Sequence, residues 1–248
     1  MESSIFETFT LPSKGLVYDT PINPEITLRS MNTLDELLRC SPSETPYKVM
    51  CDIIEGCMKE KPAIHVYDMC IGDYQFLLHK IRIVTYGSDY KMSVTCPNCN
   101  DFVEVNANLD SLDIIEYNEE YENLKEITLP ISNHFIELKY QTPRDLDTIE
   151  RRNKEIQRKL KTSVDYKLIY TLMSLIKTVD GQVLNSIQLE EFVKKLPMKD
   201  VNYLINTADK LNKSIGIDNT VLAKCSHCGY EMVVPFRLTS EFFGPSIN

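Results

Sequence analysis

Two pairs of cysteines, Cys96-Pro97-Asn98-Cys99 and Cys225-Ser226-His227-Cys228, have a spacing that suits metal binding. Two residues between thiols let both sulfur atoms turn toward one point, and two such pairs supply the four thiolates of a closed tetrahedral Zn²⁺ site. We therefore expect one structural Zn²⁺ per chain, bound by Cys96, Cys99, Cys225 and Cys228. A closed site leaves no position for water or substrate, so the expected metal is not catalytic.

The competing interpretations are a redox pair and turns without metal. A thioredoxin-like redox pair needs a helix that begins at the motif. Here polar and apolar residues alternate on both sides of each pair, in residues 91–95 and 102–105 and again in residues 220–224 and 230–234. This period of two predicts a β-hairpin with the cysteines at its tip. Asn100 and Gly229, which follow the pairs, tolerate the positive φ that such a turn needs.

The other four cysteines share no tight spacing, and we expect them to be small buried side chains on helical stretches, with a second metal site as the alternative. They are Cys40, Cys51, Cys57 and Cys70. The first residues, Met1-Glu2-Ser3-Ser4, do not resemble a secretory signal. In a reducing compartment, metal binding or burial explains cysteines better than disulfide bonds do.

Charge and motif content narrow the function classes. The chain has 27 Lys and Arg against 36 Asp and Glu, a net charge of −9, which repels phosphate backbones and anionic lipid. We therefore expect no nucleic-acid partner, and the apolar runs are too short for a membrane span. The sequence has no Gly-rich phosphate loop, no Gly-x-Ser-x-Gly elbow and no helical pair of metal-binding histidines. It is not expected to be an enzyme.

The elements around the cysteine pairs predict an α+β fold: a zinc ribbon made of two distant hairpins, bracketing an inserted region, with an N-terminal strand and helix part. We expect residues 1–90 to form N-terminal strands and helices, and residues 91–106 the first knuckle hairpin. An acidic loop and β-hairpin would occupy residues 107–141, and a helical insertion residues 142–216. The second knuckle hairpin and the C-terminal tail would occupy residues 217–248. The metal would thus join distant parts of the chain.

Capping residues and apolar spacing place the helices. Asn32 is expected to cap a short helix, and Asp73 a helix from Tyr74 to about Thr85. A further helix is expected over residues 46–58. Pro143 would begin a charged helix, residues 164–176 a more apolar one, and Asn185 with Gln188 would form a capping box. A last helix carries apolar residues from Val201 to Leu211.

Three surfaces leave alternatives open. Residues 113–126 contain six acids and one Lys, and form either a solvated loop or a docking surface for a basic partner. The helix from Arg144 to Lys161 has seven basic and four acidic residues around a narrow apolar stripe. It packs either on its own domain or as a seam to another subunit. Phe242 and Phe243 either anchor a partner or fold back on the ribbon.

The sequence resembles the baseplate hub proteins of T-even-type contractile-tail phages and their relatives. The resemblance runs from Glu25-Ile26-Thr27-Leu28-Arg29-Ser30-Met31 through Cys70-Ile71-Gly72-Asp73, Arg82-Ile83-Val84-Thr85-Tyr86-Gly87, Thr95-Cys96-Pro97-Asn98-Cys99 and Cys225-Ser226-His227-Cys228 to Glu241-Phe242-Phe243-Gly244-Pro245. It implies a non-enzymatic structural or assembly component of the tail baseplate, located in the virion after assembly in the host cytoplasm. Its partners would be other baseplate and tail proteins in a larger hetero-oligomer. The alternative is a zinc-ribbon module that binds nucleic acid or serves transcription.

Overall fold

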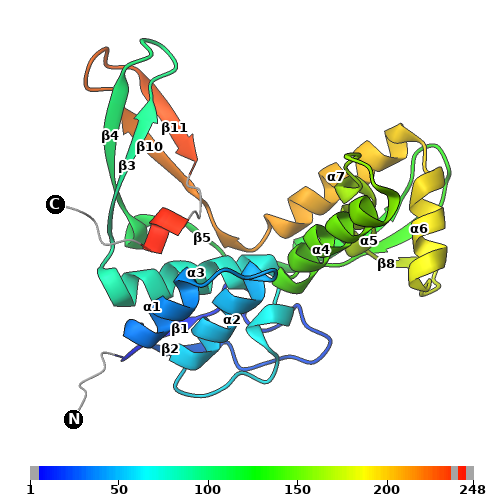
Figure 1. The fold of residues 1–248 in the computed structure, drawn as a ribbon, viewed down its shortest axis with the longest axis horizontal. Helices are drawn as coiled ribbons and strands as arrows, with labels where there is room; N and C mark the ends of the chain where they lie inside the picture. The colour runs from blue at the N-terminus through cyan, green and yellow to red at the C-terminus, as the bar shows by residue number, and fades with distance from the viewer. Residues whose placement is uncertain (1–5, 236–239, 244–248) are drawn as a thin grey trace.

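The structure is a computed structural model that describes residues 6–235 and 240–243. Within these residues the fold is a mixture of helices and small sheets, of which four have two strands and one has three. Figure 1 shows that the elements form three parts. We name them the N-terminal body (residues 6–87), the hairpin arm (residues 89–108 and 220–235) and the helical lobe (residues 126–212).

The N-terminal body packs helices on a two-stranded antiparallel sheet. Its elements are β1 (Phe6–Thr10), β2 (Glu25–Arg29), α1 (Thr33–Cys40), α2 (Pro46–Cys57), the short 3-10 helix η1 (Val66–Asp68) and α3 (Ile71–Tyr86). The predicted cap is confirmed, because the Asn32 side chain accepts hydrogen bonds from the first turn of α1. Apolar side chains from the strands, α2, η1 and α3 meet in one core around Leu28, Ile54, Leu77 and Ile81.

The helix α3 begins earlier than its sequence predicts. Its N-cap is Cys70, not Asp73, and the helix starts at Ile71. Asp73 lies inside the first turn and is fully buried. Its carboxylate accepts hydrogen bonds from the Ser13 backbone at 3.0 Å, from the Ser13 hydroxyl and from the Tyr18 hydroxyl at 2.5 Å. The predicted cap was wrong because this carboxylate ties the loop after β1 to the helix instead.

The hairpin arm consists of two antiparallel hairpins. β3 (Asp89–Thr95) pairs with β4 (Phe102–Asn108), and β10 (Thr220–Lys224) pairs with β11 (Glu231–Pro235). Alternate residues of both hairpins face a small shared core made of Cys96, Val103, Val105, Cys225, Met232 and Val234. The expected hairpins with cysteines at their tips are therefore confirmed, and the arm projects away from the N-terminal body (Figure 1).

The helical lobe covers a three-stranded antiparallel sheet with four helices. The sheet has the order β6 (Glu126–Thr128), β7 (Phe135–Leu138) and β8 (Ile176–Val179). The helices are α4 (Pro143–Leu160), α5 (Lys167–Leu175), α6 (Ser186–Lys195) and α7 (Met198–Asn212). Pro143 begins α4 as predicted, and the Asn185–Gln188 capping box of α6 is present.

The strand β8 was absent from the sequence prediction, which continued a helix through Ile176. Ile176, Thr178 and Val179 are β-branched, and they complete the sheet by pairing with β7. The strand that β8 pairs with lies about 40 residues earlier in the chain. For example, the Thr178 hydroxyl donates to the Glu137 carboxylate, 41 residues away. A local apolar pattern cannot distinguish the end of a buried helix from the start of such a strand.

Two short strands carry the chain between the parts. β5 (Ile114–Ile115) follows the 3-10 helix η2 (Leu109–Ser111) on the way to the lobe, and it pairs with β9 (Gly216–Ile217) on the way back. At this crossing the backbone passes against α3, because a Cβ atom on Gly72 would lie 2.2 Å from the carbonyl oxygen of Ile215. Only glycine permits that approach. Both connections of the lobe therefore meet beside the central helix of the N-terminal body.

Candidate metal centre

The two cysteine turns of the arm have the same backbone hydrogen bonds. The Cys96 amide donates to the Asp101 carbonyl at 2.9 Å, and the Cys225 amide donates to the Tyr230 carbonyl at 2.8 Å. The residue after each second cysteine has positive φ, +60° at Asn100 and +74° at Gly229. Asparagine and glycine adopt this conformation more readily than other residues do, which confirms the predicted role of both positions.

These turns bring the four predicted ligand atoms together. The Sγ atoms of Cys96 and Cys228 are 3.7 Å apart, and those of Cys99 and Cys225 are also 3.7 Å apart. All four Sγ atoms lie within 4.8 Å of one another. A tetrahedral site with Zn–S bonds of about 2.3 Å places its sulfur atoms roughly 3.8 Å apart. The thiols therefore fit a tetrahedral thiophilic ion, and none of them forms a disulfide.

In each pair the first cysteine is more buried than the second. Cys96 and Cys225, the first members, are buried, whereas Cys99 is half-buried and Cys228 is exposed. The Asn98 side-chain amide donates to the Cys228 sulfur at 3.5 Å across the two turns. This bond, together with the Tyr230 backbone amide, lowers the pKa of Cys228 to about 6. The arrangement therefore favours a thiolate at the most exposed of the four sulfurs.

The role of Asn98 is a contact that sequence reasoning missed. It lies between the first two cysteines, but it hydrogen bonds to the sulfur of the other pair, 130 residues away. An amide side chain inside the turn was the available signal, because Asn readily donates to sulfur or backbone acceptors. His227, at the matching position of the second pair, is exposed.

The remaining cysteines lie far from this cluster in the fold. Cys51 and Cys57 belong to the core of the N-terminal body, and Cys70 belongs to the core of the helical lobe. Their predicted burial is confirmed. Cys40 is exposed, so the prediction was wrong for this residue. It ends α1, a helix whose Leu34, Leu37 and Leu38 are also exposed, because only one narrow side of α1 contacts the body.

The aromatic pair near the C-terminus packs on the N-terminal body and not on the arm. Phe242 and Phe243, in η4 (Ser240–Phe243), are buried in the core that contains α3. The Arg82 guanidinium, which is itself fully buried, donates from Nε to the Phe242 carbonyl at 3.2 Å. This finding selects the fold-back alternative for the pair, although the surface that it contacts differs from the one expected.

The fold and the cysteine cluster define a mixed helix and sheet protein with a candidate structural metal centre, and a comparison of sequences identifies its family. Residues 6–244 match the family described as T4 bacteriophage base plate protein. The chain belongs to this family, and the family places it in the tail baseplate of the virion. Such baseplate proteins associate with other tail proteins and are generally not enzymes. No curated protein and no solved structure matches the chain.

Within residues 6–235 and 240–243, none of the helices combines the length and the apolar character needed to cross a bilayer.

Proposed function

We propose that this protein is a structural or assembly component of the baseplate hub, and that it acts through contacts with other tail proteins. A single structural Zn²⁺, held by Cys96, Cys99, Cys225 and Cys228, clasps its two hairpins into a zinc ribbon. The observation that carries the metal proposal is the convergence of four Sγ atoms from two distant turns within 4.8 Å. The baseplate role rests on the family membership.

The size of the arm supports a stabilising role for the metal. A two-stranded hairpin is marginal in water, and the core that the two hairpins of the arm share has six buried residues. Two of these six are Cys96 and Cys225. Binding of structural Zn²⁺ in small domains is worth on the order of 10 kcal/mol, which is comparable to the roughly 6 to 12 kcal/mol that four buried apolar side chains contribute. The metal would supply a large share of the free energy that holds the hairpins together.

The clasp would also define how the lobe is attached. Cys99 and Cys225 are separated by 126 residues, and the helical lobe lies between them in the chain. Closure of so long a loop costs entropy that rises only with the logarithm of its length, so one strong site can offset it. The zinc would then hold the chain segment that leads into the lobe in a fixed position relative to the segment that leads out of it. A rigid shape suits a subunit that has to match several neighbours.

The alternative nucleic-acid role has less support on the arm itself. Its exposed strand faces carry Lys91 and Lys224, but also Asp89, Glu104 and Glu231. A surface that binds a phosphate backbone needs an excess of cations. The arm has no such excess, which favours contact with proteins.

Elemental analysis of the purified protein tests the metal proposal. We expect one Zn²⁺ per chain, and we expect Cys225→Ser to lose the metal and to lower the melting temperature strongly. Cys40→Ser is the matched control, because Cys40 is exposed and remote from the cluster. A metal-free wild-type protein, or equal metal content and stability in Cys225→Ser, would contradict the clasp.

Cross-linking of intact tails followed by mass spectrometry tests the hub role. Cross-links from the arm or lobe to central baseplate proteins are the expected result. The proposal fails if virions contain no such cross-links and phage particles lacking this protein assemble complete baseplates. Because the zinc measurement uses purified protein, the two parts of the proposal fail independently.

A further inference from the structure

The C-terminal half of α4 carries a cationic surface in an otherwise acidic protein. Lys154 and Arg158 are four residues apart on α4 and share one side of the helix, and Lys161, which caps the helix with a φ of +50°, lines the same shallow hollow as these two residues. All three are exposed. Among the described residues, none has a carboxylate partner within ion-pair distance. We call these three residues the basic face.

An anionic surface lies on the segment that connects the arm to the lobe. Glu119 and Glu120, in the 3-10 helix η3 (Glu119–Leu124), and Glu126, at the start of β6, are all exposed. In the described part of the chain none of the three forms an ion pair, whereas Glu116 and Glu122 are paired with lysines. We call Glu119, Glu120 and Glu126 the acidic face.

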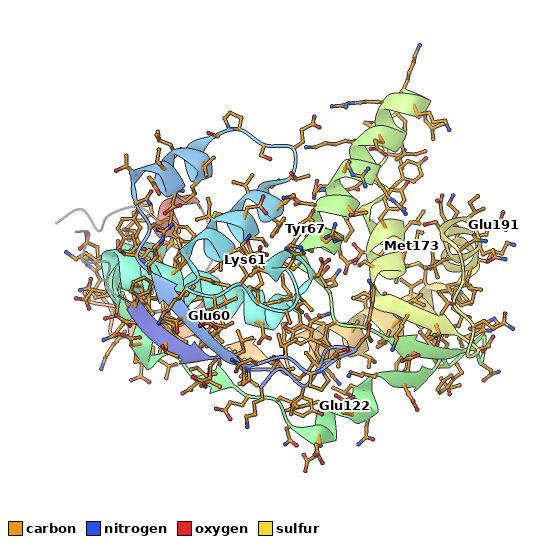
Figure 2. All side chains as sticks on the ribbon, turned by 90° about the horizontal axis from the view of Figure 1, so that it is seen from below. Glu60, Lys61, Tyr67, Glu122, Met173 and Glu191 are labelled. Atoms are coloured by element: carbon orange, nitrogen blue, oxygen red, sulfur yellow. The ribbon has the colours of Figure 1, made fainter. Side chains whose placement is uncertain are left out.

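The two faces lie at opposite sides of the molecule. In Figure 2, α4 runs to the top of the view and its last turns project beyond the other helices, whereas Glu122, which marks η3, lies at the bottom. The N-terminal part of α4 is held against the N-terminal body, since Asp147 contacts α2 and Arg144 pairs with Asp68. The basic face and the acidic face of one chain therefore cannot meet.

We propose that the basic face of one copy of this protein docks on the acidic face of a second copy. The two surfaces are complementary in charge, and neither has an ion-pair partner among residues 6–235 and 240–243 of its own chain. Because the surfaces are different, the contact is heterologous: each new copy leaves one free face of each kind. Such head-to-tail contacts generate a ring if the rotation closes and a helical array if it does not. This inference goes beyond the proposed function and does not depend on the metal.

Apolar side chains beside both faces add to the contact. Leu160 and Val164, next to the basic face, are 53% and 55% exposed, and Tyr121 in η3 is 37% exposed. Each copy carries a net charge of −9, which opposes association at long range. At physiological ionic strength the Debye length is about 8 Å, so distant charges are largely screened while contacting pairs still attract.

Sedimentation velocity on the full-length protein tests the proposal with two charge-reversal variants. One carries Lys154→Glu, Arg158→Glu and Lys161→Glu, and the other carries Glu119→Lys, Glu120→Lys and Glu126→Lys. The control carries Lys195→Glu, Lys199→Glu and Lys210→Glu, which changes the net charge as much as the first variant does but alters exposed lysines elsewhere on the lobe. Circular dichroism confirms that each variant is folded.

We expect concentration-dependent association of wild type at 0.15 M salt, weakened at about 0.5 M. Each charge-reversal variant on its own should associate about tenfold more weakly than wild type, since three exposed ion pairs are lost. An equimolar mixture of the two variants should associate again, because each presents the charge that the other lacks. The control should behave as wild type does.

A monomeric wild type at all concentrations would overturn the proposal, and so would a mixture of variants that fails to associate. A third outcome would also overturn it. If wild type stays monomeric but binds duplex DNA, and the Lys154, Arg158 and Lys161 reversals abolish that binding, the basic face recognises phosphate and not a second copy.

Discussion

The carboxylate of Asp147 caps a helix that lies 99 residues earlier in the chain, since it accepts a hydrogen bond of 2.9 Å from the backbone N–H of Lys48. α2 has no cap of its own, because Thr45 makes no side-chain bond to the first turn. Asp147 also accepts from the Tyr47 amide at 3.3 Å and from the Tyr67 hydroxyl at 3.0 Å. The lobe and the N-terminal body thus share one buried anion.

Removal of this shared cap should loosen both parts. Asp147→Ala leaves the amides of α2 and the Tyr67 hydroxyl without an acceptor in a buried place, and we expect a loss of about 2 to 3 kcal/mol in unfolding free energy. Urea denaturation measures it. Glu155→Ala is the control on the same helix, since Glu155 pairs with Arg151 at an exposed position, and its loss should stay within about 0.5 kcal/mol. Equal losses would show that Asp147 does not cap α2.

Two glycine substitutions should change stability in opposite directions. Gly72→Ala places a methyl group against the Ile215 carbonyl at the crossing of β9 and α3, and we expect a cost of about 1 to 3 kcal/mol or more. Gly56→Ala lies in α2 with open space at the Cβ position, and alanine should stabilise that helix by roughly 0.5 to 1 kcal/mol. Melting temperatures of both variants check the pair. A neutral Gly72→Ala would contradict the tight crossing.

His79 should make the protein sensitive to mild acid. It is fully buried, and burial lowers its pKa from 6.5 to about 4. Between these values the unfolded chain binds a proton that the folded chain does not, so stability is greatest above pH 6.5 and falls as the pH drops toward 4. The full effect is about 3 kcal/mol. The unfolding free energy, measured with urea, should differ less between pH 7.0 and pH 4.5 in His79→Gln than in wild type. His65→Gln, which changes an exposed histidine, is the control and should keep the wild-type difference.

Phe242 should contribute more to stability than its place near the chain end suggests. Its ring is fully buried in the core of the N-terminal body, and its carbonyl accepts from Arg82. Phe242→Ala should cost about 3 to 5 kcal/mol in unfolding free energy. Phe102→Ala removes a ring that is 78% exposed on the arm and should cost under about 0.5 kcal/mol. Similar losses in the two variants would rule out the anchoring role of Phe242.

Features that depend on neighbouring residues were predictable from the sequence. The cysteine hairpins follow from a period of two on either side of each pair, and the positive φ of Asn100 and Gly229 follows from residue type. Capping at Asn32 and Asn185 depends on residues within three positions. In each case the interacting groups are close in sequence, so little chain entropy is lost when they meet, and the local pattern suffices.

Features that depend on distant partners were decided by the tertiary structure. Asp73 has the residue type of a helix cap, but it bonds to Ser13, 60 residues away. β8 continues an apolar run whose pattern predicts a helix, and it is a strand because it pairs with β7. Arg82 reaches the Phe242 carbonyl across 160 residues. Spacing identified the four cysteines, but the core that the two hairpins share decides that the two pairs meet across 126 residues. Burial and long-range hydrogen bonds outweigh weak local preferences.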